Sequence, residues 1–152
     1  MAKGGQGALT VRVEIEGAEE TLRAFRRLPK DASAALRDRS MELAQTLAVK
    51  VAGAGNTDTP QSALVAVTVR ARRDRIPVIV AGGAKRVGSR RKPAFKILFG
   101  SEFGSNHLPQ FRPHQGKHSY WFFDEVYRSQ SEIAAAWGKA ADDVVRSFSR
   151  ET

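Results

Sequence analysis

The chain has no cysteine, and this absence excludes several kinds of site at once. Without thiols there are no disulfides, no thiolate nucleophile and no cysteine-based zinc site. No apolar run is long enough to span a bilayer. The Gly-rich start, residues 1–7, lacks the apolar centre of a signal peptide. We therefore expect one domain of 152 residues, made in the cytoplasm, with residues 1–7 as a flexible arm and no membrane partner.

Signatures of catalysis and of phosphate binding are missing as well. Gly82-Gly83 follows a predicted strand, but the Lys-Ser/Thr pair of a phosphate-binding loop is absent, and no serine has the spacing of a nucleophile elbow. His114 and His118 would share a helix face, yet Pro113 and Gly116 favour a loop. Exposed loop residues are therefore the better interpretation of the three histidines, which are His107, His114 and His118. The sequence predicts no enzyme, no cofactor and no metal site.

Positive charge is present in excess, and it is concentrated in one stretch. Residues 70–96 hold ten Lys and Arg and one acid, Asp74, so ten minus one gives +9, which equals the formal net charge of the chain. Clustered positive charge repels itself unless something negative neutralises it, which favours a polyanionic partner. The residues that we expect to face DNA are Arg70, Arg72, Arg73, Arg75, Lys85, Arg86, Arg90, Arg91 and Lys92.

The placement of these bases indicates how DNA would be contacted. They are on no predicted recognition helix and are not interleaved with exposed aromatic residues, which disfavours sequence-specific readout and single-strand stacking. Contacts to phosphates would be independent of sequence and sensitive to salt. Two alternatives stay open: a solvated charged surface, and salt bridges to an acidic neighbouring subunit.

Hydrophobic periodicity predicts an α+β domain, in which a small antiparallel sheet packs against a long N-terminal helix and a long C-terminal helix. Two extended loops, residues 83–95 and 104–120, connect these elements. The expected elements are a strand at 8–16, a short helix at 18–28, a helix from 31 that ends at Gly53 and Gly55, a helical turn at 61–66, a strand alternating through Val65, Val67 and Val69, a hairpin turn at 72–75, a strand at 76–81, a further strand within 95–103 and a helix at 122–149.

Aromatic residues gather in the last third of the chain. A helix that begins Trp121-Phe122-Phe123 cannot turn all three rings onto one face, so we expect Trp121 or Phe122 to face a partner. Aromatic anchors of this kind are typical of protein interfaces. The predicted interface residues are Phe99, Phe103, Phe111, Trp121 and Phe122.

Glu102 stands alone, as the only acid between Asp74 and Asp124. A buried carboxylate needs a partner, and Arg112 is the expected one because Arg can bind a carboxylate in bidentate fashion. Two residues later, Gly104 allows a positive φ or a close approach of another chain segment. Glu102, Gly104 and Arg112 are therefore predicted to have structural roles.

Residues 98–105, Leu-Phe-Gly-Ser-Glu-Phe-Gly-Ser, resemble the Glu-Phe-Gly-Thr/Ser segment of the small tail-completion and head–tail joining (neck connector) proteins of long-tailed bacteriophages. In that family a loop with Pro and Arg follows, then an aromatic residue and a C-terminal helix; here these are residues 108–113, 120–123 and 122–149. The order of elements is similar along nearly the whole chain. The sequence departs at Ser105, where Thr is commoner, and in a longer His-containing insertion at 114–119.

The resemblance implies a structural protein of the virion neck or tail, present in the host cytoplasm during assembly. It implies a homo-oligomeric ring, often sixfold, between the portal–adaptor–stopper stack and the tail tube or tail terminator, with double-stranded DNA passing through it. Within such a ring the basic stretch would line the channel or reach an acidic neighbour. A tail terminator ring of the same virion and a free basic DNA-binding module are the alternatives.

Overall fold

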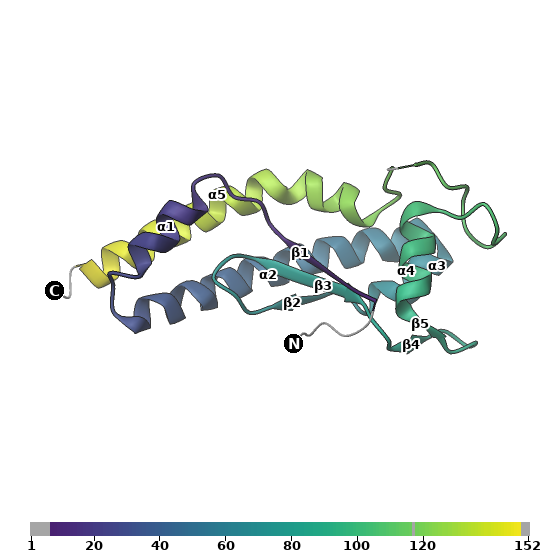
Figure 1. Cartoon of the computed structure of the whole chain (residues 1–152), viewed down its shortest axis with the longest axis horizontal. Helices are drawn as coiled ribbons and strands as arrows, with labels where there is room; N and C mark the ends of the chain where they lie inside the picture. The colour runs from purple at the N-terminus through teal and green to yellow at the C-terminus, as the bar shows by residue number, and fades with distance from the viewer. Residues whose placement is uncertain (1–6, 117, 150–152) are drawn as a thin grey trace.

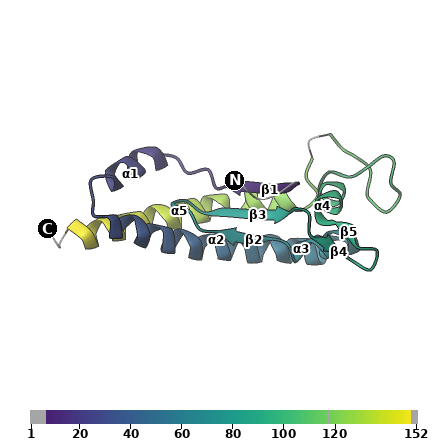
Figure 2. The ribbon, with the colours of Figure 1, turned by 60° about the horizontal axis from the view of Figure 1, so that its bottom comes forward.

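Two long antiparallel helices run along an elongated molecule, and a small sheet covers one side of the pair (Figure 1, Figure 2). The computed structural model describes residues 7–116 and 118–149. The helices are α2 (Lys30–Asp58) and α5 (Phe122–Ser149), and the sheets are one of three strands and one of two, all antiparallel. The predicted α+β class is confirmed. Residues 1–6 of the predicted arm lie outside the described residues.

Both long helices form because apolar side chains recur every three or four residues. In α5 the buried stripe includes Val126, Ile133, Trp137 and Val144, and the predicted bounds of this helix are confirmed. In α2 the prediction of an end at Gly53 and Gly55 is wrong, because the helix continues to Asp58. A Cβ at Gly55 would lie 2.7 Å from the Trp121 ring. This glycine therefore allows a close approach rather than ending the helix.

The main sheet has the order β1-β3-β2, formed by β1 (Ala8–Arg12), β3 (Val78–Gly82) and β2 (Arg70–Arg72). A hairpin is confirmed in this region, but its turn covers residues 73–77 rather than the predicted 72–75, and its second strand is Val78–Gly82 rather than 76–81. The predicted alternating strand through Val65, Val67 and Val69 is wrong. Val65 belongs to α3 (Pro60–Ala66), which confirms the predicted helical turn and is stabilised by a capping box between Thr59 and Ser62.

The strand predicted within 95–103 is wrong, since this segment is helix α4 (Ala94–Phe103). Its buried residues fall at helical spacing: Ala94, Ile97, Leu98, Ser101 and Glu102. A short apolar run does not by itself distinguish a strand from a buried helix. The preceding segment also differs from the predicted extended loop, because it contains the small hairpin of β4 (Arg86–Val87) and β5 (Lys92–Pro93).

The buried side chains form two clusters along the long axis. The larger one joins the sheet to α2, α4 and the start of α5, through residues such as Leu47, Ile79, Leu98 and Phe122. The smaller one holds α1 (Ala18–Phe25) against the other end of the long helices, around Trp137. The β4–β5 hairpin and helix α1 lie toward opposite ends of the molecule (Figure 1). Within the described residues no helix is long and apolar enough to cross a membrane.

Candidate functional site

The outer face of the main sheet carries part of the basic stretch. The register pairs Val78 with both Arg12 and Arg72, and it pairs Val80 with Arg70. Residues paired across antiparallel strands lie on the same face, so these arginines flank two valines that are buried. Long arginine stems can cover apolar surface while the guanidinium stays in water. Arg70 and Arg72 thus present positive charge from the face opposite the core.

The β2–β3 turn is tied to both long helices. Arg73 forms an ion pair with Asp38 of α2, so its charge is already matched within the protomer. The carbonyl of Arg75 accepts hydrogen bonds from Trp137 Nε1 at 2.8 Å and from Ser40 Oγ at 2.8 Å. These bonds hold the turn in place and leave the Arg75 side chain half-buried beside it.

The β4–β5 hairpin and the start of α4 carry the larger group of free cations. Arg86 Nη1 donates to the carbonyl of Arg91 at 2.9 Å, and Arg91 has a φ of 54°, which closes a tight turn after Gly88. Within residues 7–116 and 118–149, none of these exposed cations forms an ion pair. This group, here called the basic hairpin, consists of Lys85, Arg86, Arg90, Arg91, Lys92 and Lys96.

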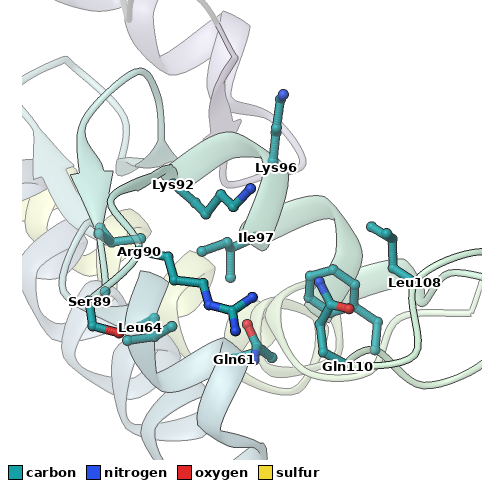
Figure 3. Close-up of a pocket in the computed structure, with 12 residues that line it drawn as sticks. Gln61, Leu64, Ser89, Arg90, Lys92, Lys96, Ile97, Leu108 and Gln110 are labelled. Carbon is teal, nitrogen blue, oxygen red and sulfur yellow. The ribbon is translucent and has the colours of Figure 1, made fainter.

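A groove of about 620 Å³ lies beside the basic hairpin (Figure 3). Arg90 and Lys92 come from the hairpin and Lys96 from α4; the Arg90 side chain extends toward Gln61 of α3, whereas that of Lys96 points away from Gln61. The apolar lining comes from α3, β4, α4 and the 104–120 loop: Leu64, Val87, Ile97, Leu108 and Phe111. Among the residues that the structure describes, no acidic one lines the groove. A groove of this size, with cations at its border and an apolar lining, suits a ligand that carries both an anionic group and an apolar part.

Glu102 is fully buried, and its partner is the start of α5 rather than Arg112. Its Oε1 accepts the backbone N–H groups of Trp121 at 3.0 Å and Phe122 at 2.7 Å, and its Oε2 accepts that of Phe123 at 2.9 Å. The Ser119 hydroxyl also donates to Oε2 and accepts the N–H of Asp124. A helix N-terminus leaves such N–H groups unpaired and is positively polarised, so a carboxylate satisfies both needs.

Arg112 pairs instead with Asp58, the last residue of α2, so the predicted pair with Glu102 is wrong. Its two terminal nitrogens contact the two carboxylate oxygens of Asp58. The guanidinium also lies 3.8 Å from the centre of the Tyr120 ring, a cation–π contact. Arg112 therefore joins the 104–120 loop to the end of α2.

Gly104 has the predicted positive φ, 79°, with ψ at 175°. A Cβ there would lie 2.3 Å from the carbonyl oxygen of Pro113. Gly100 is similar in one respect, since a Cβ would lie 2.4 Å from the Phe111 ring. Both glycines let the 104–120 loop fold back onto α4, and Ser105 N–H donates to the Arg112 carbonyl at 2.7 Å.

The aromatic prediction is partly wrong. Trp121 and Phe122 are 3% and 0% exposed, because Trp121 packs on Gly55 and Phe122 enters the main core. Phe111 is half-buried over Gly100, whereas Phe99 is 40% exposed. The rings that reach the surface form a continuous row across α4 and α5: Phe99, Phe103, Phe123 and Tyr127. Tyr127, 70% exposed, was missed, although the spacing of four from Phe123 signals a shared helix face.

The histidines do not converge. Among the described residues no group of three His, Cys, Asp or Glu side chains could hold a metal ion. His114 Nδ1 instead contacts the carbonyl oxygen of Phe103 at 3.0 Å.

Comparison with known proteins finds no matching family model, no matching curated protein and no matching solved structure.

Proposed function

We propose that this chain is a structural virion protein of a long-tailed bacteriophage, which forms a ring in the neck through which double-stranded DNA passes. The proposal rests on the resemblance of residues 98–105 to the Glu-Phe-Gly segment of neck connector and tail-completion proteins. In this proposal the role of the protein is structural, and the ring is a homo-hexamer. Its neighbours are stopper or adaptor proteins on one side and the tail tube or tail terminator on the other.

The observation that carries the proposal is the use that the fold makes of this segment. Glu102 caps α5, Gly100 admits Phe111, and Gly104 lets the following loop return to α4. Glu102 and Gly104, two residues of the segment that carries the resemblance, therefore each have a defined physical task. Each of these two positions restricts which residue type it accepts, and this supports the resemblance.

The distribution of positive charge fits a conduit for DNA. Arg70 and Arg72 on the sheet face, together with the basic hairpin, supply many solvent-facing cations without a recognition helix. Such contacts neutralise phosphates one at a time and do not read bases. A duplex that must slide through a channel is better served by several weak contacts than by a few tight ones.

Two other functions agree with the same chemistry. A tail terminator ring would share the fold, the oligomer and the virion location, and it differs only in its neighbours. A free basic DNA-binding module would use the basic hairpin as an arm, and it would act as a monomer or dimer. The oligomeric state separates this second alternative from both rings.

Light scattering after size exclusion, at low and at high salt, tests the proposal. A ring protein is expected to elute as one discrete species with the mass of six or more protomers, and electron microscopy of that species should show a central channel. A protein that stays a monomer or dimer and binds short duplexes with a steep salt dependence would instead be the free DNA-binding module.

A further inference from the structure

The segment that runs from the end of β1 into the first turn of α1 is acidic and faces solvent. Four glutamates fall within residues 13–22, with no base among them. All four are exposed, and none forms an ion pair with another described residue. This group, here called the acidic segment, consists of Glu14, Glu16, Glu19 and Glu20.

The acidic segment and the basic hairpin cannot meet within one protomer. Helix α1 lies toward one end of the long axis and β4–β5 at the other, and the two views agree on this separation (Figure 1, Figure 2). One molecule thus carries unneutralised negative charge on residues 13–22 and unneutralised positive charge on the basic hairpin, while the exposed bases Arg23, Arg26 and Arg27 follow the acidic segment. Two copies placed with these two surfaces in contact bring the opposite charges together.

We infer that the groove beside the basic hairpin receives the acidic segment of a second copy of this chain. Charge complementarity carries the assignment, since Arg90, Lys92 and Lys96 border the groove with no acid among its described lining residues, while the acidic segment holds no base. Gln61 and Gln110 add neutral hydrogen-bonding groups to the rim of the groove. The inference rests on the ring proposed above and identifies the contact between its subunits.

The geometry of this contact leads to a ring. The two surfaces differ, so the interface is heterologous, and a repeated heterologous contact closes into a ring when the rotation allows it. The groove suits a protein segment better than a duplex, because its apolar lining through Leu64, Ile97 and Phe111 offers no partner to phosphates. In this arrangement Arg90, Lys92 and Lys96 are used between subunits rather than on DNA, whereas Arg70 and Arg72 remain outside the groove and stay available to DNA.

A charge-swap experiment tests the contact. The first variant, Arg90→Glu/Lys92→Glu, turns the three cations that line the groove into two acids and one base. The second, Glu14→Lys/Glu16→Lys/Glu19→Lys, turns the four glutamates of the acidic segment into three bases and one acid. Each variant alone then places like charges on the groove and on the segment that would enter it, and it is expected to lose the ring and run as a monomer. In an equimolar mixture each groove meets a segment of opposite charge from the other variant, so the mixture is expected to restore the mass of an assembly with an even number of subunits.

The matched control for the groove variant is Lys139→Glu/Arg146→Glu, which lowers the net charge by the same amount on α5 and is expected to leave the oligomer unchanged. Circular dichroism establishes that each variant is folded. If wild-type protein forms a ring and either swapped variant alone also forms it, the inference is overturned while the proposed function stands. If the groove variant keeps the ring but binds DNA more weakly, the inference is also overturned, and the groove is then assigned to DNA.

Disulfide trapping decides the case in which no ring is seen in solution. Because the chain has no cysteine, Glu16→Cys and Arg90→Cys can be mixed as single variants and oxidised at high protein concentration. Disulfide-linked heterodimers well above those formed by Glu16→Cys with Lys139→Cys support the contact. An equal yield from both pairs overturns it, and it does so whether or not the proposed ring exists.

Discussion

The backbone N–H of Phe122 donates a 2.7 Å hydrogen bond to the carboxylate of Glu102, which lies 20 residues earlier in the chain. With this bond the end of α4 caps the start of α5, and the whole 104–120 loop is closed between two fixed points. The carboxylate is buried, yet it has four donors around it. The only acid in this part of the sequence is therefore a structural anchor.

Removal of this anchor should destabilise the protomer. Glu102→Ala leaves three backbone N–H groups without acceptors, and we expect a loss of about 3 kcal/mol in the free energy of unfolding. Glu102→Gln keeps one acceptor oxygen, so its free energy of unfolding should lie between those of the wild type and Glu102→Ala. Urea denaturation followed by circular dichroism measures both, with the exposed Glu42→Ala as control. An unchanged unfolding midpoint for Glu102→Ala would refute the capping role.

Two glycine-to-alanine changes should act in opposite directions. Gly104→Ala places a Cβ against the Pro113 carbonyl at a positive φ, so we expect a loss of roughly 2 kcal/mol or more. Gly138→Ala lies inside α5 with nothing within 4 Å of the new Cβ, and it should stabilise the protein by about 0.5–1 kcal/mol. Thermal melts of both variants measure the difference, and a stabilised Gly104→Ala would contradict the close approach described here.

The arginines of the sheet face should contribute to DNA binding unequally. Arg70→Ala/Arg72→Ala removes two cations from this face, and for each phosphate that is then no longer neutralised the slope of log affinity against log salt should become shallower by about 0.9. Arg73→Ala is the control, because Arg73 is already paired with Asp38. Fluorescence anisotropy with a short duplex at several salt concentrations measures the slopes. An effect of Arg73→Ala as large as that of the double variant would argue against this face.

The ion pair between Lys50 and Glu132 predicts a small dependence of stability on pH. The hydrogen bond and the charge of Lys50 lower the pKa of Glu132 below 4.5, and Glu132 in turn raises the pKa of Lys50 above 10.5. A lowered carboxyl pKa contributes stability above the unfolded-state pKa, and this contribution is lost as the pH falls through the folded-state pKa. A raised lysine pKa contributes stability below the unfolded-state value, which is lost as the pH rises through the folded one.

Melting temperatures of wild type and Glu132→Gln should therefore differ at neutral pH and converge as the solution becomes acidic. The difference should also shrink in high salt, because both side chains are exposed. Glu42→Gln, with an exposed carboxylate that has no ion-pair partner among the described residues, should show no such convergence. A pH-independent difference for Glu132→Gln would show that its effect does not come from the charge.

The sequence predicted the elements whose signal is local and repeated. The α5 stripe spans many turns, and a period of three to four residues leaves little choice of structure. The β2–β3 hairpin and the positive φ of Gly104 were predicted for similar reasons, since alternation and glycine chemistry act over a few residues. The 95–103 segment was predicted wrongly because a short apolar run satisfies two periods equally well.

For the candidate site, too, composition predicted some features and only the fold decided others. Composition alone determined that the net charge is concentrated in residues 70–96 and that cysteine chemistry is excluded. It did not determine which cations are free, since Arg73 finds Asp38 only when the hairpin packs on α2. The groove likewise depends on segments that are far apart in sequence, with Gln61, Lys92 and Gln110 meeting around one hollow.

By itself, the sequence determined the class of fold, the two long helices and the place of the charge, because periodicity and composition are properties of neighbouring residues. Only the tertiary structure decided the partners of Glu102 and Arg112 and the burial of Trp121 and Phe122. Those outcomes depend on which donors and cavities the folded chain brings within a few ångströms of one another. Hydrogen bonds and packing act only at that range, and the spacing of residues along the chain does not encode it.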